Sequence, residues 1–120
     1  MGLVTVDDRQ RYAIDARDWM PMKIGEAALP GFFWIPVSGD ESGAWASYWM
    51  KLEPGARSVM HRHGATELLL ILEGVFSDAD GADYHAGEVV TYAAGSTHSS
   101  YSATGCIVLV VTAADSRVAA

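Results

Sequence analysis

Glycine and proline recur at short intervals along most of this 120-residue chain, and this spacing constrains the fold more than any other feature. They stand at Gly31, Pro36, Gly39, Gly43, Pro54, Gly55, Gly64, Gly74, Gly81, Gly87, Gly95 and Gly105. The segments around them are rich in β-branched, aliphatic and aromatic residues: FFWIPV, AWASYWMKLE, TELLLILEGVFS, EVVTYAA, HSSYSA and GCIVLVVTA. Short apolar segments bounded by turn residues predict short strands that pack as an all-β sandwich or barrel.

The chain has no linker, low-complexity tract or repeat of fixed period, so its length predicts a single domain. Within it we expect an N-terminal arm at residues 1–30, a β-barrel at 31–113 and a tail at 114–120. The segment RQRYAIDARDWM lacks a clean apolar stripe, so we expect at most one helical turn in the arm.

Two apolar runs, LLLIL and CIVLVV, lack the alternation that is typical of a strand with one face in water. In a small barrel, one face of each strand fills the interior. The other face then needs a second sheet, the N-terminal arm or a partner subunit to cover it. We expect a homodimer in which the partner covers at least one of these strands.

Composition excludes several classes of partner. The formal net charge is -7, the isoelectric point is near 4.8, and no run of Lys or Arg makes a basic patch, which argues against a nucleic-acid partner. The start, MGLVTVDDRQRYAID, has no signal-peptide pattern, and CIVLVV is too short to cross a bilayer. The single cysteine, Cys106, cannot form an internal disulfide. We therefore expect a cytoplasmic protein with a small-molecule substrate or ligand and no membrane partner.

The polar residues with metal-binding chemistry concentrate in one region. His61 and His63 are two residues apart, so on a strand both imidazoles project from the same face. Gly64 permits a tight bend, after which Glu67 begins the next strand and returns its carboxylate toward the histidines. His98 follows the turn signal AAGST, and its strand can lie against the His-x-His strand. Three imidazoles and one carboxylate predict a metal site inside the barrel.

Each of these residues also has an ordinary interpretation. A His-x-His pair arises by chance on exposed strands, a glutamate before an apolar strand is usually solvated, and His98 could be a surface residue of its turn. Taken together, the three histidines and the glutamate favour a metal site. Burying so many polar side chains without a metal ion would leave polar atoms without partners, which is costly.

The stretch GARSVMHRHGATELLLILEG resembles the first motif of the cupin family. That motif is Gly, five residues, His-x-His, three or four residues, Glu, six residues, Gly. It is met here by Gly55, His61, His63, Glu67 and Gly74. The resemblance implies a double-stranded β-helix, also called a jelly-roll barrel, with the two histidines and Glu67 as metal ligands.

The stretch GEVVTYAAGSTHSSYS is similar to the second cupin motif, and it supplies Gly87, Gly95 and His98 at the family's intervals. Ala93 stands where the family usually has proline, and Ser102 stands where it often has asparagine. Neither departure touches a ligand. The resemblance thus implies that His98 is the fourth ligand, and the two motifs cover residues 55 to 102.

A narrower resemblance is to the ChrR-like cupin domain of zinc-binding anti-sigma factors. It is carried by a Glu-Gly-x-Phe-x-Asp stretch at 73–78, a Gly-Ser-x-His turn at 95–98 and Gly-Cys at 105–106. The same group includes small stand-alone dioxygenases that cleave carbon–carbon bonds in β-diketones or hydroxyacetophenones. We expect no N-terminal helical domain of the kind that would hold a sigma factor, so that role is not favoured.

The ligand set leaves the chemistry open. Four ligands close a tetrahedral zinc site, whereas around octahedral Fe(II) they leave two open positions. We expect one divalent metal ion per chain, Fe(II) or Zn(II), with manganese and nickel as further candidates. The hypothesis is an Fe(II) dioxygenase-type enzyme for a small dicarbonyl or hydroxy-carbonyl compound, with Glu67 as a ligand or as a catalytic base. The alternatives are a non-catalytic zinc-binding sensory module and a cupin isomerase or lyase.

Other residues receive structural interpretations. His85 is interpreted as an ordinary strand histidine and Cys106 as a buried, inert thiol. Arg62 should point away from the metal because it lies between two ligands on a strand. The tryptophans are assigned mainly to core and interface packing.

Overall fold

The computed structural model describes residues 2–15, 18–113 and 116–118 and is all-β, as the sequence predicts. A single 3-10 turn, η1 (Val6–Asp8), precedes the strands in this part of the chain. The strands are β1 (Met20–Ile24), β2 (Ala27–Gly39), β3 (Ala46–Leu52), β4 (His61–His63), β5 (Glu67–Asp78), β6 (Asp83–His85), β7 (Val89–Tyr92), β8 (Thr97–His98), β9 (Ser100–Tyr101), β10 (Cys106–Thr112) and β11 (Ser116–Val118). Among the described residues, no helix is long and apolar enough to span a membrane.

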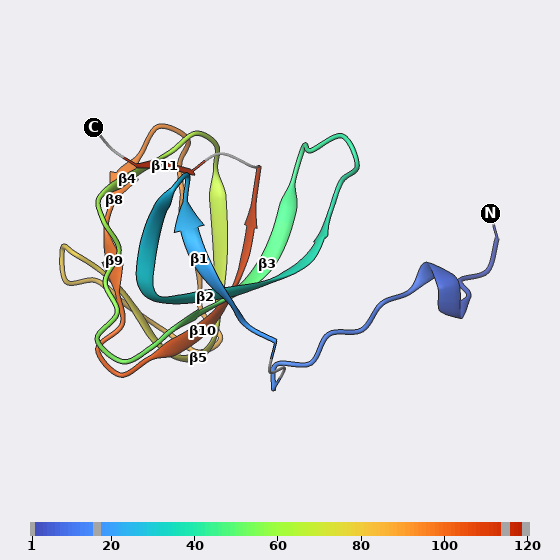
Figure 1. The fold of residues 1–120 in the computed structure, drawn as a ribbon, viewed down its shortest axis with the longest axis horizontal. Coiled ribbons are helices and arrows are strands. Elements are labelled where there is room, and N and C mark those ends of the chain that lie inside the picture. The colour runs from blue at the N-terminus through green and yellow to red at the C-terminus, as the bar shows by residue number, and fades with distance from the viewer. Residues whose placement is uncertain (1, 16–17, 114–115, 119–120) are drawn as a thin grey trace.

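The strands form two antiparallel sheets around a common interior (Figure 1). The larger sheet has the order β1-β2-β3-β10-β5-β6, and both β7 and β9 also pair with β5. The smaller sheet has the order β11-β4-β8. The twelve-residue strand β5 therefore pairs with β10 on one edge and with β6, β7 and β9 on the other, which curls the larger sheet.

The core is built mainly from side chains of the larger sheet. Its fully covered side chains include Leu52, Leu69, Ile71, Phe76 and Val108. Each points inward because successive strand residues alternate between the two faces of a sheet. The interior of the barrel is thus largely apolar.

The outer faces of the two apolar runs are only partly covered within one chain. In β10, Cys106, Val108 and Val110 are buried, whereas the residues between them are half-buried. In β5, Leu69 is buried but Leu68 is 36% exposed. The expectation that both faces are covered is therefore not met by the chain alone. The homodimer stays a prediction.

Strand β1 and the start of β2 lie within residues 1–30, so part of the expected arm joins the larger sheet. The division into arm, barrel and tail stays a prediction. Strand β1 pairs with β2 from Met20 opposite Trp34 to Ile24 opposite Ala27. Strand β1 lies at the edge of the sheet and contains Pro21, a residue that edge strands tolerate. Because proline is otherwise rare in strands, it obscured the strand pattern of this segment in the sequence.

The described part of the N-terminal arm holds one helical turn, η1, which meets the expectation of at most one turn. This turn lies before the segment RQRYAIDARDWM, and the described part of that segment holds no helix. At the other end, β11 pairs with β4 inside the expected tail of 114–120, placing Ser116 opposite His63. Residues 16–17, 114–115 and 119–120 lie outside the described part of the chain.

Candidate metal centre

The His-x-His segment forms β4, and its alternation directs both imidazoles inward. His63 is 1% exposed and His61 is 9% exposed, while Arg62 between them faces solvent, as expected. Strand β8 pairs with β4 so that His98 lies directly opposite His61. The predicted adjacency of these two short strands is thus confirmed. The bend between β4 and β5 falls at Gly64 and Ala65.

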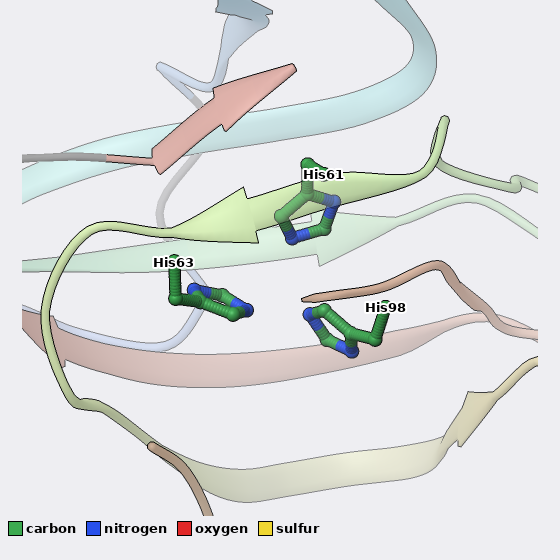
Figure 2. A group of neighbouring side chains, drawn as sticks. All are labelled: His61, His63 and His98. Carbon is green, nitrogen blue, oxygen red and sulfur yellow. The ribbon is translucent and has the colours of Figure 1, made fainter. Parts of the chain in front are cut away.

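The three imidazoles face one another in a compact group (Figure 2). Their ring centroids are separated by 4.9 Å for His61 and His63, 4.5 Å for His61 and His98, and 4.6 Å for His63 and His98. One nitrogen atom of each ring lies within 4.8 Å of the corresponding atoms of the other two. Three convergent imidazole nitrogens are a donor set suited to zinc, iron, nickel or copper.

The hydrogen bonds of the rings leave nitrogen atoms available to a metal. Nδ1 of His61 donates to the carbonyl oxygen of Val59 at 3.1 Å, and Nδ1 of His98 donates to Oδ1 of Asp78 at 2.8 Å. In both rings Nε2 is then the acceptor nitrogen. Within the described structure, Nε2 of His98 and Nε2 of His63 are buried without a hydrogen-bond partner. Buried polar atoms in this state are costly unless a ligand satisfies them, so the residues present fit a metal ion.

Burial also favours the neutral form that a metal ligand must have. Desolvation is the main cause that lowers the pKa of His61 below its ordinary value, and the neighbouring His98 and His63 act in the same direction. The hydrogen bond to Val59 opposes this shift but does not cancel it. A neutral imidazole presents a lone pair to a metal, whereas a protonated one does not.

Glu67, the fourth predicted ligand, lies beside the histidine group. It is the first residue of β5, is 7% exposed, and places Oε2 at 3.4 Å from Nδ1 of His63. The compact group among the described residues consists of the three histidines without Glu67. The structure therefore brings three of the four predicted ligands together and holds the fourth against one of them. The role of Glu67 as ligand or base stays a prediction.

A cavity of about 510 Å³ adjoins the histidines. His61, His98 and Glu67 contribute to its wall, together with Tyr48 and Lys23. Burial raises the pKa of Tyr48 above its ordinary value, and the charge of Glu67 acts in the same direction, so its phenol stays uncharged. The rest of the wall is mainly apolar and includes Met22, Leu29, Phe32, Trp34, Met50, Leu69 and Phe76. The cavity has the size and character of a site for a small, largely apolar molecule.

Sequence reasoning missed Asp78, which accepts the hydrogen bond from His98. Burial acts to raise the pKa of its carboxyl, but hydrogen bonds from His98, Tyr84 and Tyr92 outweigh burial, and the pKa lies below its ordinary value. Tyr92 also stacks against the ring of His63, with centroids 5.3 Å apart and planes inclined by 11°. Asp78 is the last residue of the Glu-Gly-x-Phe-x-Asp stretch that the sequence analysis noted. No local sequence pattern, however, connects Asp78 with His98, which lies 20 positions later.

His85 and Cys106 have the structural roles expected of them, whereas no tryptophan belongs to the buried core of the described residues. His85 is exposed on β6, away from the three-histidine group. Cys106 is buried, and desolvation raises the pKa of its thiol, so it is a poor nucleophile. Arg57 lies over the ring of Tyr101 at 4.8 Å, as a cation–π pair.

Comparison with known proteins agrees with this geometry. The sequence model of the ChrR cupin-like domain matches residues 7–114, which is most of the chain. The chain belongs to this cupin family. A comparison with curated protein sequences gives no significant match.

Solved structures share the cupin fold at low sequence identity. An acetylacetone dioxygenase from Acinetobacter johnsonii is 12% identical with a TM-score of 0.73, covering 97% of this chain and 83% of that one. A chain of the complex between Rhodobacter sphaeroides SigE and the anti-sigma ChrR is 20% identical with a TM-score of 0.67, covering 83% and 50%. A cupin-like protein from Ralstonia eutropha JMP134 is 17% identical with a TM-score of 0.65, covering 72% and 57%. This chain spans only about half the length of the ChrR-complex chain and of the Ralstonia protein. At these low identities, the structural similarities establish the fold alone.

Proposed function

We propose that this cupin is a non-haem Fe(II) dioxygenase-type enzyme that acts on a small dicarbonyl or hydroxy-carbonyl compound. The observation that carries the proposal is the cavity of about 510 Å³ into which His61 and His98 open. A closed structural or sensory metal site has no need of such a space, whereas an enzyme must place its substrate beside the metal. The dioxygenase fold relative supports the same reaction class.

In this proposal the three histidines hold the metal through the nitrogens that their hydrogen bonds leave available. When bound, Fe(II) would supply Lewis acidity and open positions for substrate and dioxygen. Phe32, Phe76 and the other apolar residues of the cavity exclude water from the carbonyl substrate. Glu67 stands in the same wall and would either complete the ligand set or take the acidic proton from the carbon between two carbonyl groups.

One observation favours a second function, a zinc-binding sensory module. The Glu67 carboxylate lies 3.4 Å from His63, so a small side-chain movement would add it to the three imidazoles. Three histidines and one carboxylate close a tetrahedral zinc site and leave no position for substrate. The fold likeness to a chain of the SigE–ChrR complex is in keeping with this alternative.

Metal content and oxygen consumption distinguish the two functions. The protein is purified without chelator, its metals are measured, and it is then loaded anaerobically with Fe(II) and screened for oxygen uptake with β-diketones and hydroxy-ketones. We expect iron-dependent uptake that is abolished in His61→Ala and His98→Ala. The matched control is His85→Ala, which removes the histidine that lies outside the group and should leave uptake unchanged.

Stoichiometric zinc, together with no oxygen uptake after iron loading, would contradict the dioxygenase proposal and support the sensory module. Turnover of a carbonyl compound without oxygen consumption would instead indicate an isomerase or lyase. A protein that binds no metal at neutral pH, even after loading, would contradict the metal site itself.

A further inference from the structure

The side chain of Asp78 is the centre of a buried hydrogen-bond network behind the histidines. Asp78 is the last residue of β5 and is 7% exposed. Its Oδ1 accepts hydrogen bonds from Nδ1 of His98 at 2.8 Å and from Oγ of Ser100 at 3.1 Å. Its Oδ2 accepts from the hydroxyl of Tyr84 at 2.8 Å, and the hydroxyl of Tyr92 lies 3.0 Å from Oδ1 and 2.9 Å from Oδ2. These donors surround the carboxylate and hold it in one orientation.

The orientation of the carboxylate determines which nitrogen of His98 carries the proton. A carboxylate that already receives hydroxyl donors can only accept, so Nδ1 of His98 must be the protonated nitrogen. Its Nε2, which is buried without a hydrogen-bond partner in the described structure, then directs a lone pair toward His61 and His63. Without an acceptor behind Nδ1, the ring would be free to take the other tautomer or to rotate.

Tyr92 connects this network to a second ligand. Its hydroxyl donates to Asp78, while its ring lies 4.1 Å from the ring of His98 and stacks on His63 at 5.3 Å. One tyrosine, itself held by Asp78, therefore packs against two of the three imidazoles. Both imidazoles are confined to the rotamers that face the centre of the group.

The turn at the end of β5 does not require the side chain of Asp78. The turn after β5 is closed by backbone groups, with the amide of Gly81 donating to the carbonyl of Asp78 at 2.9 Å. The amide of Asp78 donates in turn to the carbonyl of Ala82 at 2.9 Å. The turn would keep these bonds with any side chain at position 78. Within the described residues, the Asp78 carboxylate forms an ion pair with His98.

We propose that Asp78 is the positioning residue of the metal centre: it fixes the Nδ1–H tautomer of His98 and, through Tyr92, braces His63. This inference rests on the metal site of the proposed function, but it does not depend on the reaction or on which metal is native. Carboxylate partners of this kind change metal affinity by about 10- to 100-fold.

The test combines metal affinity with a direct measurement of the tautomer. Zinc affinity is measured by competition with a chromophoric chelator for the wild type, Asp78→Asn, Tyr92→Phe and the control Asp83→Asn. Asp83 is the matched control because it is a carboxylate of the same hairpin that bonds to Ser77 and to no histidine. In parallel, the ring nitrogens of His98 are assigned by long-range proton–nitrogen NMR in the metal-free protein, with circular dichroism as the check of folding.

We expect wild-type His98 to be the Nδ1–H tautomer. Asp78→Asn should mix the tautomers, because an amide accepts at only one end, and should weaken zinc binding by about 10- to 100-fold. Tyr92→Phe should have a smaller effect in the same direction, and Asp83→Asn should have none. An Nε2–H tautomer in the wild type would overturn the inference, and this result needs no variant to fold. A folded Asp78→Asn protein that binds zinc within about twofold of the wild type would overturn it equally. An inactive enzyme with the expected tautomer would contradict only the proposed function.

Discussion

Replacing Gly74 by alanine should destabilise the protein far more than the same change at Gly87, although both are motif glycines. Both have positive φ, of 75° and 90°, a conformation that costs a residue with a Cβ about 1–2 kcal/mol. Both changes also recover about 0.4–1 kcal/mol through the less flexible unfolded chain. For Gly87→Ala these are the main contributions, because no atom lies within 4 Å of the added Cβ. We expect a loss of about 1 kcal/mol at Gly87.

At Gly74 the added methyl group has no space. Its Cβ would overlap the carbonyl oxygen of Gly105 and lie 3.0 Å from Cα of Cys106. These are backbone atoms at the start of β10, where Cys106 pairs with Gly74, so relief requires moving the strand that lies beside β5. Overpacking of this kind costs about 1–3 kcal/mol in addition to the conformational cost. The total expected loss for Gly74→Ala is therefore about 2–4 kcal/mol, a large part of a typical domain's stability.

Urea unfolding, followed by tryptophan fluorescence and circular dichroism on the same samples, measures the difference. With an m-value of about 2 kcal/mol/M, the midpoint of Gly74→Ala should lie about 1 M below that of Gly87→Ala. The contributions from positive φ and from the unfolded chain are common to both variants, so the difference isolates the clash between β5 and β10. Midpoints that agree within about 0.3 M would refute the reasoning.

Three further outcomes follow from burial and charge. Because burial raises the pKa of Cys106, its thiolate forms only at high pH, and alkylation of the native protein should stay slow at pH values where the unfolded chain reacts readily. Leu69→Ala should cost about 2–5 kcal/mol by urea unfolding, whereas Leu68→Ala on the outer face should cost much less; equal losses would contradict the register of β5. Burial, then the bond to Asp78, raises the pKa of Tyr84 to about 12. The protonated phenol is thus favoured by folding, so its contribution to stability is present below the ordinary pKa and is lost as the pH rises toward 12. Subtracting the ultraviolet pH titration of Tyr84→Phe from that of the wild type should show this ionisation. A Tyr84 phenol that titrates at its ordinary pKa would contradict the hydrogen bond to Asp78.

The group of three histidines was predictable because its geometry is mostly local. On a strand, the two-residue spacing of His61 and His63 is sufficient to place both rings on one face, and the burial of both with Arg62 exposed bears this out. The turn before His98 and the family resemblance placed its strand beside theirs, as the pairing of His98 with His61 confirms. The glycine spacing predicted the all-β fold for the same reason, since nine glycines have positive φ that other residues avoid.

The features that the sequence did not reveal depend on contacts between distant segments. Strand β1 was missed because an edge strand that contains Pro21 does not show the usual alternation. The exposure of Leu68 was not predicted. An apolar run alone does not indicate whether the outer face of its strand packs against the same chain, packs against another chain or is exposed to water.

The sequence by itself determined the all-β fold, the cupin family and the histidines, because strand alternation and glycine conformations are properties of a few neighbouring residues. Only the tertiary structure decided that Glu67 lies beside His63 and outside the compact group of three histidines, and that Asp78 lies behind His98. Asp78 and His98 are 20 residues apart, and their contact exists because β5 pairs with β9 at its end, Asp78 opposite Ser100. Such a contact depends on the register of two strands that a long connection separates, and no local pattern of residues records that register.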